Sequence, residues 1–378
     1  MSLARWNVNI RARMKRLIVV LLLLSSTVSM HAAGKRRAVG RSVQYPPCSM
    51  VTGSSAVTFT RNEGFTLAPL AVAPQPISYT YGVAAMIDEE DTLVAWHRDD
   101  LLISTNAGCS WRVVATIEGS DFPPKLEPAK GGRVYAWSEN RFFFVRYDAR
   151  GAVKLRQPVE FVGVNVDANN ADRVRAGGSD GTLWESVDAG ETWNPIGTKI
   201  AAPLFYRFVF NPNDLDHIVA GTTTNGAYVS RDGGRNWTQA AGFGTSGANV
   251  FHFVFSPVDG NRVWSFGINL EEGNNGEASH GRHIYLSDDG GATYTPVVDE
   301  APGVKLTNGP PMAAHPINRD VLYFIFGTHI FDYGTDLFRY DHAGRWLTLT
   351  HSSLDDVNAI TFSRKDPRVM YLGIENMD

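Results

Sequence analysis

The stretch Ser230-Arg-Asp-Gly-Gly-Arg-Asn-Trp237 has the pattern Ser-x-Asp-x-Gly-x-x-aromatic, and the chain repeats it. Two full copies are Ser186-Val-Asp-Ala-Gly-Glu-Thr-Trp193 and Ser287-Asp-Asp-Gly-Gly-Ala-Thr-Tyr294, and Ser104-Thr-Asn-Ala-Gly-Cys-Ser-Trp111 has Asn for Asp. Serine and aspartate oxygens accept hydrogen bonds from the NH groups of a turn, and glycine supplies a positive φ. The aromatic residue begins the next strand and buries a large apolar surface. The pattern therefore predicts a turn between two strands.

Three weaker copies complete the series. Two have one extra residue before the glycine: Arg146-Tyr-Asp148-Ala-Arg-Gly151 and Arg339-Tyr-Asp341-His-Ala-Gly344-Arg-Trp346. Thr60-Arg-Asn62-Glu-Gly64-Phe-Thr-Leu67 is degenerate. We call each copy a box and expect its central acidic or amide residue to be structural. These residues are Asn62, Asn106, Asp148, Asp188, Asp232, Asp289 and Asp341.

The spacing of the boxes predicts the fold. They begin at residues 60, 104, 146, 186, 230, 287 and 339, at intervals of 44, 42, 40, 44, 57 and 52 residues. A four-stranded propeller blade takes about 40–45 residues, so each interval is one blade. The chain stops after two strands without a box (357–374), and it begins with a strand, a box and a final strand (65–70) that have no inner partners. We therefore expect an all-β, seven-bladed β-propeller over residues 57–378, its last blade closed by the N-terminal strands.

The first 34 residues are typical of an export signal. Basic residues precede an apolar run at 17–24, and the small residues Ala32-Ala33-Gly34 follow it. Met14 is a possible true start. Because a membrane span needs about 20 apolar residues, we expect cleavage, no stable membrane insertion, and a secreted or periplasmic protein. Residues 35–56 are expected to be a basic, flexible linker.

The charge distribution bears on possible partners. The net charge is −4, but the first acidic residue is Glu63, and nine Lys and Arg residues lie within residues 1–41; without these nine the charge is −4 − 9 = −13. An acidic body repels phosphate backbones, so nucleic acid is not expected as a partner. Two cysteines are present, Cys48 and Cys109. Either they form a disulfide, as export permits, or they are unrelated residues; spacing alone leaves both open.

The boxes resemble the BNR/Asp-box repeats of sialidases, xyloglucan-type glycosidases, sortilin-like receptors and photosystem II assembly factors. The resemblance extends from about residue 57 to the end of the chain. It implies the propeller fold and places ligands on the face with the second-to-third-strand loops and the between-blade loops. Because this fold carries many functions, the resemblance does not choose among them.

Four basic residues of that face are candidates for one ligand site. Arg207 and His252 occupy matching positions at the start of inner strands, and Arg98 and Arg141 lie in equivalent loops of earlier blades. Together they could bind an anionic group. Alternatively, they are separate side chains that are solvated or paired with acids.

Two loops hold the other candidates. The insertion at 267–283 contains Glu272, His280 and His283, which could bind a metal, but its glycines favour a mobile polar loop. In the next blade, Asp332 could act as an acid and Tyr333 could stack on a sugar or peptide; alternatively, this loop covers the blade below it. We expect neither a metal nor a cofactor.

Catalytic signatures are weak in this sequence. Sialidases, as the resemblance implies, use an arginine triad and a Tyr–Glu pair, whereas the nearest segment, Tyr206-Arg207-Phe-Val-Phe210, lacks the expected proline. Glycosidases need two carboxyl groups about 5–10 Å apart, and the sequence nominates no pair. We therefore expect a monomeric, non-catalytic binding or scaffold propeller for a protein, peptide or glycan. The alternative is a sialidase-like glycoside hydrolase that uses loop-face carboxylates.

Overall fold

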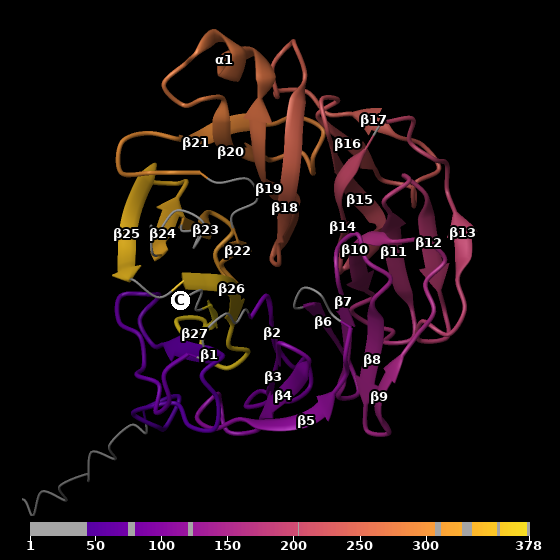
Figure 1. The fold of residues 1–378 in the computed structure, drawn as a ribbon. Coiled ribbons are helices and arrows are strands. Elements are labelled where there is room, and N and C mark those ends of the chain that lie inside the picture. The colour runs from indigo at the N-terminus through magenta and orange to yellow at the C-terminus, as the bar shows by residue number, and fades with distance from the viewer. Residues whose placement is uncertain are drawn as a thin grey trace, which may run out of the picture. The chain divides into compact units, whose positions relative to one another are not determined.

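A computed structural model describes residues 44–74, 80–119, 124–202, 204–306, 311–326, 335–353 and 356–375. All of them belong to one compact unit, Val43–Asp378. Within this unit, seven antiparallel sheets stand around a ring (Figure 1). The predicted all-β, seven-bladed propeller is confirmed. None of the described helices is both long and apolar enough to cross a membrane.

Six of the blades have four strands, which follow in chain order from the ring centre to the outer rim. Blade 1 is β2 (Gly82–Ala85), β3 (Leu93–His97), β4 (Asp100–Ser104) and β5 (Arg112–Thr116). Blade 2 is β6 (Lys125–Ala129), β7 (Arg133–Trp137), β8 (Phe144–Asp148) and β9 (Gly151–Lys154). Blade 3 is β10 (Phe161–Val166), β11 (Val174–Gly178), β12 (Leu183–Ser186) and β13 (Asn194–Ile196).

The other three complete blades follow the same order. Blade 4 is β14 (Phe205–Asn211), β15 (Asp214–Thr222), β16 (Ala227–Ser230) and β17 (Thr238–Gln239). Blade 5 is β18 (Ala248–Ser256), β19 (Asp259–Asn269), β20 (Arg282–Ser287) and β21 (Thr295–Asp299), and the helix α1 (Leu270–Asn275) follows β19. Blade 6 is β22 (Met312–Ala314), β23 (Val321–Phe326), β24 (Thr335–Asp341) and β25 (Trp346–Ser353).

The seventh blade joins the two ends of the propeller. β26 (Asp356–Phe362) pairs with β27 (Met370–Glu375), and β27 pairs with β1 (Val57–Thr60), so the predicted closure is confirmed. The continuous strand expected over residues 65–70 is wrong: this segment has two isolated bridges, Leu67 with Thr60 and Leu70 with Val51. Pro69 lacks an NH donor, and its carbonyl accepts instead from the NH of Val51 at 2.9 Å. The chain therefore leaves β1 after Ala68, whose NH still donates to the carbonyl of Phe59 at 2.8 Å.

The segment before β1 belongs to the propeller. Val51 and Ala56 are fully buried in the core beside blade 1. Cys48 and Cys109 form a disulfide, which decides between the two alternatives that the sequence left open. The flexible linker expected over residues 35–56 is therefore wrong for residues 44–56, because apolar burial and a covalent bond fix them.

Five boxes share one hydrogen-bond geometry. In blade 3, the Ser186 hydroxyl accepts from the NH of Gly190 at 2.8 Å, and Asp188 accepts from the NH of Thr192 at 2.9 Å. The boxes that begin at Ser104, Ser230 and Ser287 repeat both bonds. The degenerate box that begins at Thr60 repeats them as well, at 3.0 Å each. The turn structure predicted for these boxes is confirmed.

The two boxes with an extra residue differ. Asp148 pairs with Gly151 in a tight hairpin and accepts from the NH of Arg150 at 2.8 Å. Asp341 accepts from the NH of Gly344 at 3.3 Å. Both turns still hold β-strands together, but each acid bonds to a residue two or three positions later rather than four.

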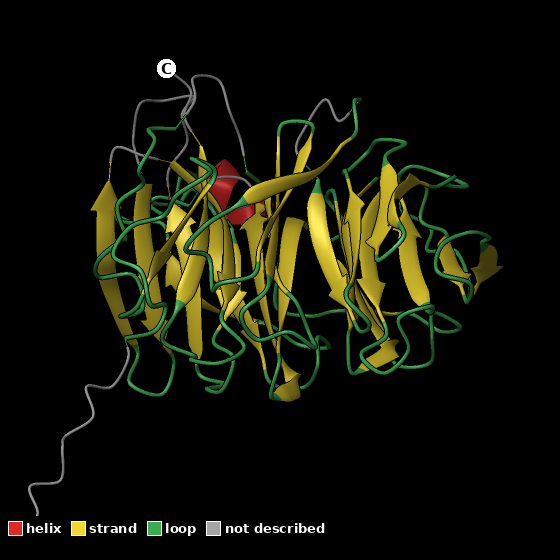
Figure 2. Cartoon of the chain, turned by 90° about the horizontal axis from the view of Figure 1, so that it is seen from below, coloured by secondary structure: helices red, strands yellow, loops and turns green. Residues whose placement is uncertain are grey.

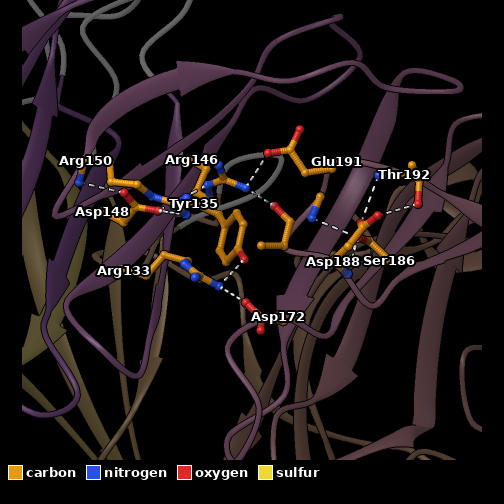
Figure 3. Close-up of polar contacts among 12 residues, drawn as sticks. Arg133, Tyr135, Arg146, Asp148, Arg150, Asp172, Ser186, Asp188, Glu191 and Thr192 are labelled. Atoms are coloured by element: carbon orange, nitrogen blue, oxygen red, sulfur yellow. Dashed lines mark hydrogen bonds and ion pairs between the residues drawn. The ribbon is translucent and has the colours of Figure 1, made fainter.

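Polar contacts hold the box of blade 3 against the preceding blade. From β8, Arg146 donates to the carbonyl of Ala189 at 3.1 Å and pairs with Glu191 at 2.9 Å (Figure 3). Beside it, Arg133 pairs with Asp172 at 2.5 Å. Turned by 90°, the strands run between two faces made of loops (Figure 2). We call the face with the second-to-third-strand loops and the between-blade connections the loop face, and the opposite one the box face.

Candidate functional site

Side chains from blades that are not neighbours meet at the centre of the ring. Arg207, on the inner strand β14 of blade 4, pairs with Glu139 in the β7–β8 loop of blade 2. Its guanidinium also lies 5.6 Å from the centre of the Trp137 ring. Because blade 3 separates blades 2 and 4, these contacts cross the middle of the ring. We call the set Lys125, Glu127, Glu139, Arg207 and His252 the channel group.

Glu139 is the counter-ion of two cations. It accepts from Lys125 Nζ at 3.1 Å and from Arg207 Nη2. Burial alone would raise the pKa of Glu139, but Arg207 and Lys125 outweigh burial and hold this pKa below its ordinary value. Burial and the charge of Arg207 lower the pKa of Lys125 to about 8. The Lys125 side chain is 32% exposed.

Burial shifts the pKa values of Glu127 and His252 toward their neutral forms. Burial raises the pKa of Glu127, on β6, to about 8, and Asn165 donates to it at 3.3 Å. Burial lowers the pKa of His252, on β18, well below its ordinary value, and the charges of Arg207 and Lys125 lower it further. The pKa values of the two carboxyl groups in the channel group are therefore shifted in opposite directions.

This arrangement permits two kinds of chemistry. Carboxyl groups whose pKa values are pushed apart can act as a proton donor and a proton acceptor. However, Glu139 is already neutralised by two cations, which weakens it as a base or nucleophile. The same group is equally a set of fixed charges at the loop-face end of the ring, suited to contact a polar segment of a partner.

Two residues of the predicted anion site, Arg207 and His252, lie near each other in the structure. Arg207 and His252 are close enough for Arg207 to lower the pKa of His252. Arg98 lies in the turn between β3 and β4, and the exposed Arg141 donates to the carbonyl of Asn140 at 2.9 Å. Asp332 and Tyr333 lie outside the described residues.

Glu272 fastens the insertion of blade 5. Asn269 caps α1 by accepting from the NH of Glu271 at 3.0 Å. Glu272 bonds to His283 Nε2 at 2.6 Å, and His283 Nδ1 bonds to Asp299 at 2.8 Å. The expected mobile loop is therefore wrong: residues 267–283 carry a capped helix held to β20 and β21. Among the described residues, no group of three metal-ligating side chains is assembled.

Sequence reasoning missed Lys125, Glu127 and Glu139. Lys125-Leu-Glu127-Pro alternates polar and apolar residues along an inner strand, which is a signal for polar side chains directed toward the ring centre. Glu139 lies two residues before Arg141, in a loop that already held a candidate residue. Their meeting with Arg207 depends on ring closure, which no local pattern encodes.

Comparison with known proteins gives a relative over most of the chain. The dispase autolysis-inducing protein of Streptomyces mobaraensis is 43% identical over 338 residues, which cover 88% of this chain and 90% of the relative. The Sortilin-Vps10 family model (sortilin, neurotensin receptor 3) matches residues 181–321.

Solved structures show the same fold at low identity. The GH74 xyloglucanase from Xanthomonas campestris matches with a TM-score of 0.58 and 15% identity, covering 78% of this chain and 51% of the xyloglucanase. YCF48 from Cyanidioschyzon merolae matches with a TM-score of 0.55 and 12% identity, covering 79% and 97%. YCF48 bound to a D1 peptide matches with a TM-score of 0.53 and 10% identity, covering 87% and 100%. This chain thus spans about half the length of the xyloglucanase. At these identities the similarity shows the fold alone, whereas the relative shows the family. The chain belongs to the family of the dispase autolysis-inducing protein, within the BNR-type β-propellers.

Proposed function

We propose that the chain is an exported, monomeric, non-catalytic binding module whose loop face recognises a partner protein, and that this partner is a protease. The observation that carries the proposal is the 43% identity over 88% of the chain to a protein named for inducing the autolysis of dispase. Autolysis is self-digestion, so that relative acts on a protease. Export is supported by the basic and apolar pattern of the first 34 residues.

Two further observations support binding over catalysis. In the channel group, Lys125 and Arg207 neutralise Glu139, which favours a fixed recognition surface over a reactive carboxylate. A propeller of the same fold, YCF48, has been solved with a D1 peptide bound, which supports a protein or peptide segment as the class of ligand.

The test uses dispase as the probe. Dispase is incubated with the purified chain, and the intact protease is followed by gel electrophoresis. Binding to inhibitor-blocked dispase is measured by biolayer interferometry. We expect faster loss of intact dispase and saturable binding, with the heat-denatured chain as the control. An unchanged dispase half-life together with no binding at micromolar concentration contradicts the proposal.

A second candidate function is a glycoside hydrolase, favoured by two carboxyl groups of the channel group with oppositely shifted pKa values, raised for Glu127 and lowered for Glu139. A general acid and a carboxylate partner are what glycosidases require. A panel of fluorogenic glycosides tests it. Turnover that Glu127→Gln abolishes supports a hydrolase, and absence of turnover on every substrate contradicts it.

A further inference from the structure

The outermost strand of a propeller blade has one edge without a partner strand, and such edges can pair with another chain. Short length, proline and charged side chains are the usual means that prevent this pairing. In this propeller, β17 has two residues, and β13 has three, one of them proline. β5 contains Arg112, β9 contains Lys154, and β21 contains Pro296 and Asp299. Five outer strands are therefore protected.

β25 of blade 6 has none of these protections. It spans eight residues, Trp-Leu-Thr-Leu-Thr-His-Ser-Ser, without proline, lysine, arginine or acid. Large apolar side chains are exposed on it: Trp346 by 71%, Leu349 by 49% and Leu347 by 37%. Figure 1 shows β25 at the outer rim of the ring.

The two leucines form one apolar stripe. In the register with β24, Leu347 pairs with Tyr340 and Leu349 pairs with Phe338. Paired residues lie on the same face of a sheet, and residues two apart in a strand share a face. Tyr340 and Phe338 belong to the buried core between blades 5 and 6. Leu347 and Leu349 therefore continue that core to the surface, where they are 37% and 49% exposed.

The backbone edge of β25 is open over Trp346–Thr350. Among the described residues, the backbone hydrogen bonds of this stretch are those of the ladder with β24. The box turn of blade 7 approaches the sheet from its face, since Gly64 packs against the side chains of Leu337 and Thr350. The neighbouring blade thus covers a face of the sheet and not this edge.

We propose that β25 is a docking edge that takes an extended segment of the partner protein as a fifth strand of blade 6. Only an extended backbone can pair with the alternating NH and carbonyl groups of a strand edge, so the ligand is a peptide segment. Its alternate apolar side chains pack beside Leu347 and Leu349. This inference rests on the proposed function and adds to the loop face a second contact with the partner, at the outer rim of blade 6.

Charge favours a foreign chain over a second copy. After Arg41 the chain carries a formal charge of −13, so two copies repel each other, whereas β25 itself is uncharged. The segment that fits is neutral or basic, extended and alternately apolar.

The experiment compares dispase binding by the full chain, by Leu347→Lys/Leu349→Lys and by the matched control Val113→Lys. Val113 is 50% exposed on the outer strand β5, so the control adds a charge to a similarly exposed site elsewhere. We expect the double variant to bind dispase about tenfold more weakly and the control to bind as the parent does. Thermal melts confirm that the variants fold. In the parent chain, amide hydrogen exchange over Trp346–Thr350 should slow when dispase binds, which tests the proposal without any substitution.

Each outcome has a distinct meaning. If dispase binds the parent and the double variant equally, and these amides gain no protection, the docking edge is refuted while the proposed function stands. If the parent does not bind dispase, the proposed function fails, and the docking edge fails with it. If light scattering shows a concentration-dependent dimer that the double variant loses, the occupant is a second copy and the proposal is overturned.

Discussion

Replacing Cys48 and Cys109 with serine removes the covalent bond between the segment before β1 and the box turn of blade 1. The folded contacts around this bond do not depend on it. Thr52 NH donates to the carbonyl of Cys109 at 3.0 Å, and Trp111 NH donates to the carbonyl of Thr52 at 3.1 Å. The substitution therefore acts mainly on the unfolded chain, which gains conformational freedom.

The size of the effect follows from the length of the loop. The two cysteines are 61 residues apart. In the chain-entropy account, a loop of this length restricts the unfolded chain by about 14 cal/mol/K, or about 4 kcal/mol at 25 °C. The unit Val43–Asp378 is expected to have an unfolding entropy of about 0.7 kcal/mol/K at its midpoint. The melting temperature should therefore fall by about 6 °C.

Differential scanning calorimetry with and without reductant measures this change. We expect reductant to lower the melting temperature of the parent chain to that of Cys48→Ser/Cys109→Ser and to leave the variant unchanged. Cys109→Ser alone should match the double variant. A parent chain whose melting temperature stays the same under reductant refutes the reasoning.

Three further predictions concern the core, the boxes and the channel group. Phe59→Ala, in the closing strand, should lower the unfolding free energy by about 3–5 kcal/mol, whereas Phe65→Ala, at a side chain that is 52% exposed, should leave the denaturation midpoint nearly unchanged. Hydrogen bonds from Thr192 hold the pKa of Asp188 below its ordinary value of about 3.9, so the contribution of this carboxylate to folding stability is present above that pH and is lost as the pH falls. Asp188→Asn should therefore make the melting temperature fall less steeply as the pH is lowered. The same acid dependence in the parent and the variant would contradict this prediction. Burial raises the pKa of Glu127 to about 8, so the contribution of this carboxyl group to folding stability is present below about pH 4.3 and is lost as the pH rises to about 8. Glu127→Gln should therefore make the melting temperature fall less steeply over this pH range. An unchanged slope in a pH series of thermal melts would count against the prediction.

The fold was predictable because the boxes are local. The bonds that define a box join residues no more than four positions apart, as between Ser186 and Gly190, so a short pattern contains the whole turn. Even the degenerate box at Thr60 keeps this geometry. The error over residues 65–70 arose because Pro69 cannot donate to a ladder and its carbonyl bonds to Val51, which lies earlier in the chain.

The candidate site was not predictable to the same degree. Arg207 and Glu139 come from blades that are not neighbours, and their pairing exists only once the ring closes. The shifted pKa of Glu127 likewise depends on burial by several blades. The sequence identified Arg207 and His252 by their position on inner strands, but it could not show that their neighbours in space are Lys125 and Glu139.

The pairing of β1 with β27 has a consequence for biosynthesis. Val57 lies opposite Gly373, so β1 has to wait for almost all of the remaining chain to be made before it gains its partner strand. Until then, an edge of the nascent protein is open at each end of the growing series of blades. Cys109, in contrast, follows Cys48 by only 61 residues. Once the disulfide forms, it keeps β1 beside the first blade, where β27 must arrive to pair with it.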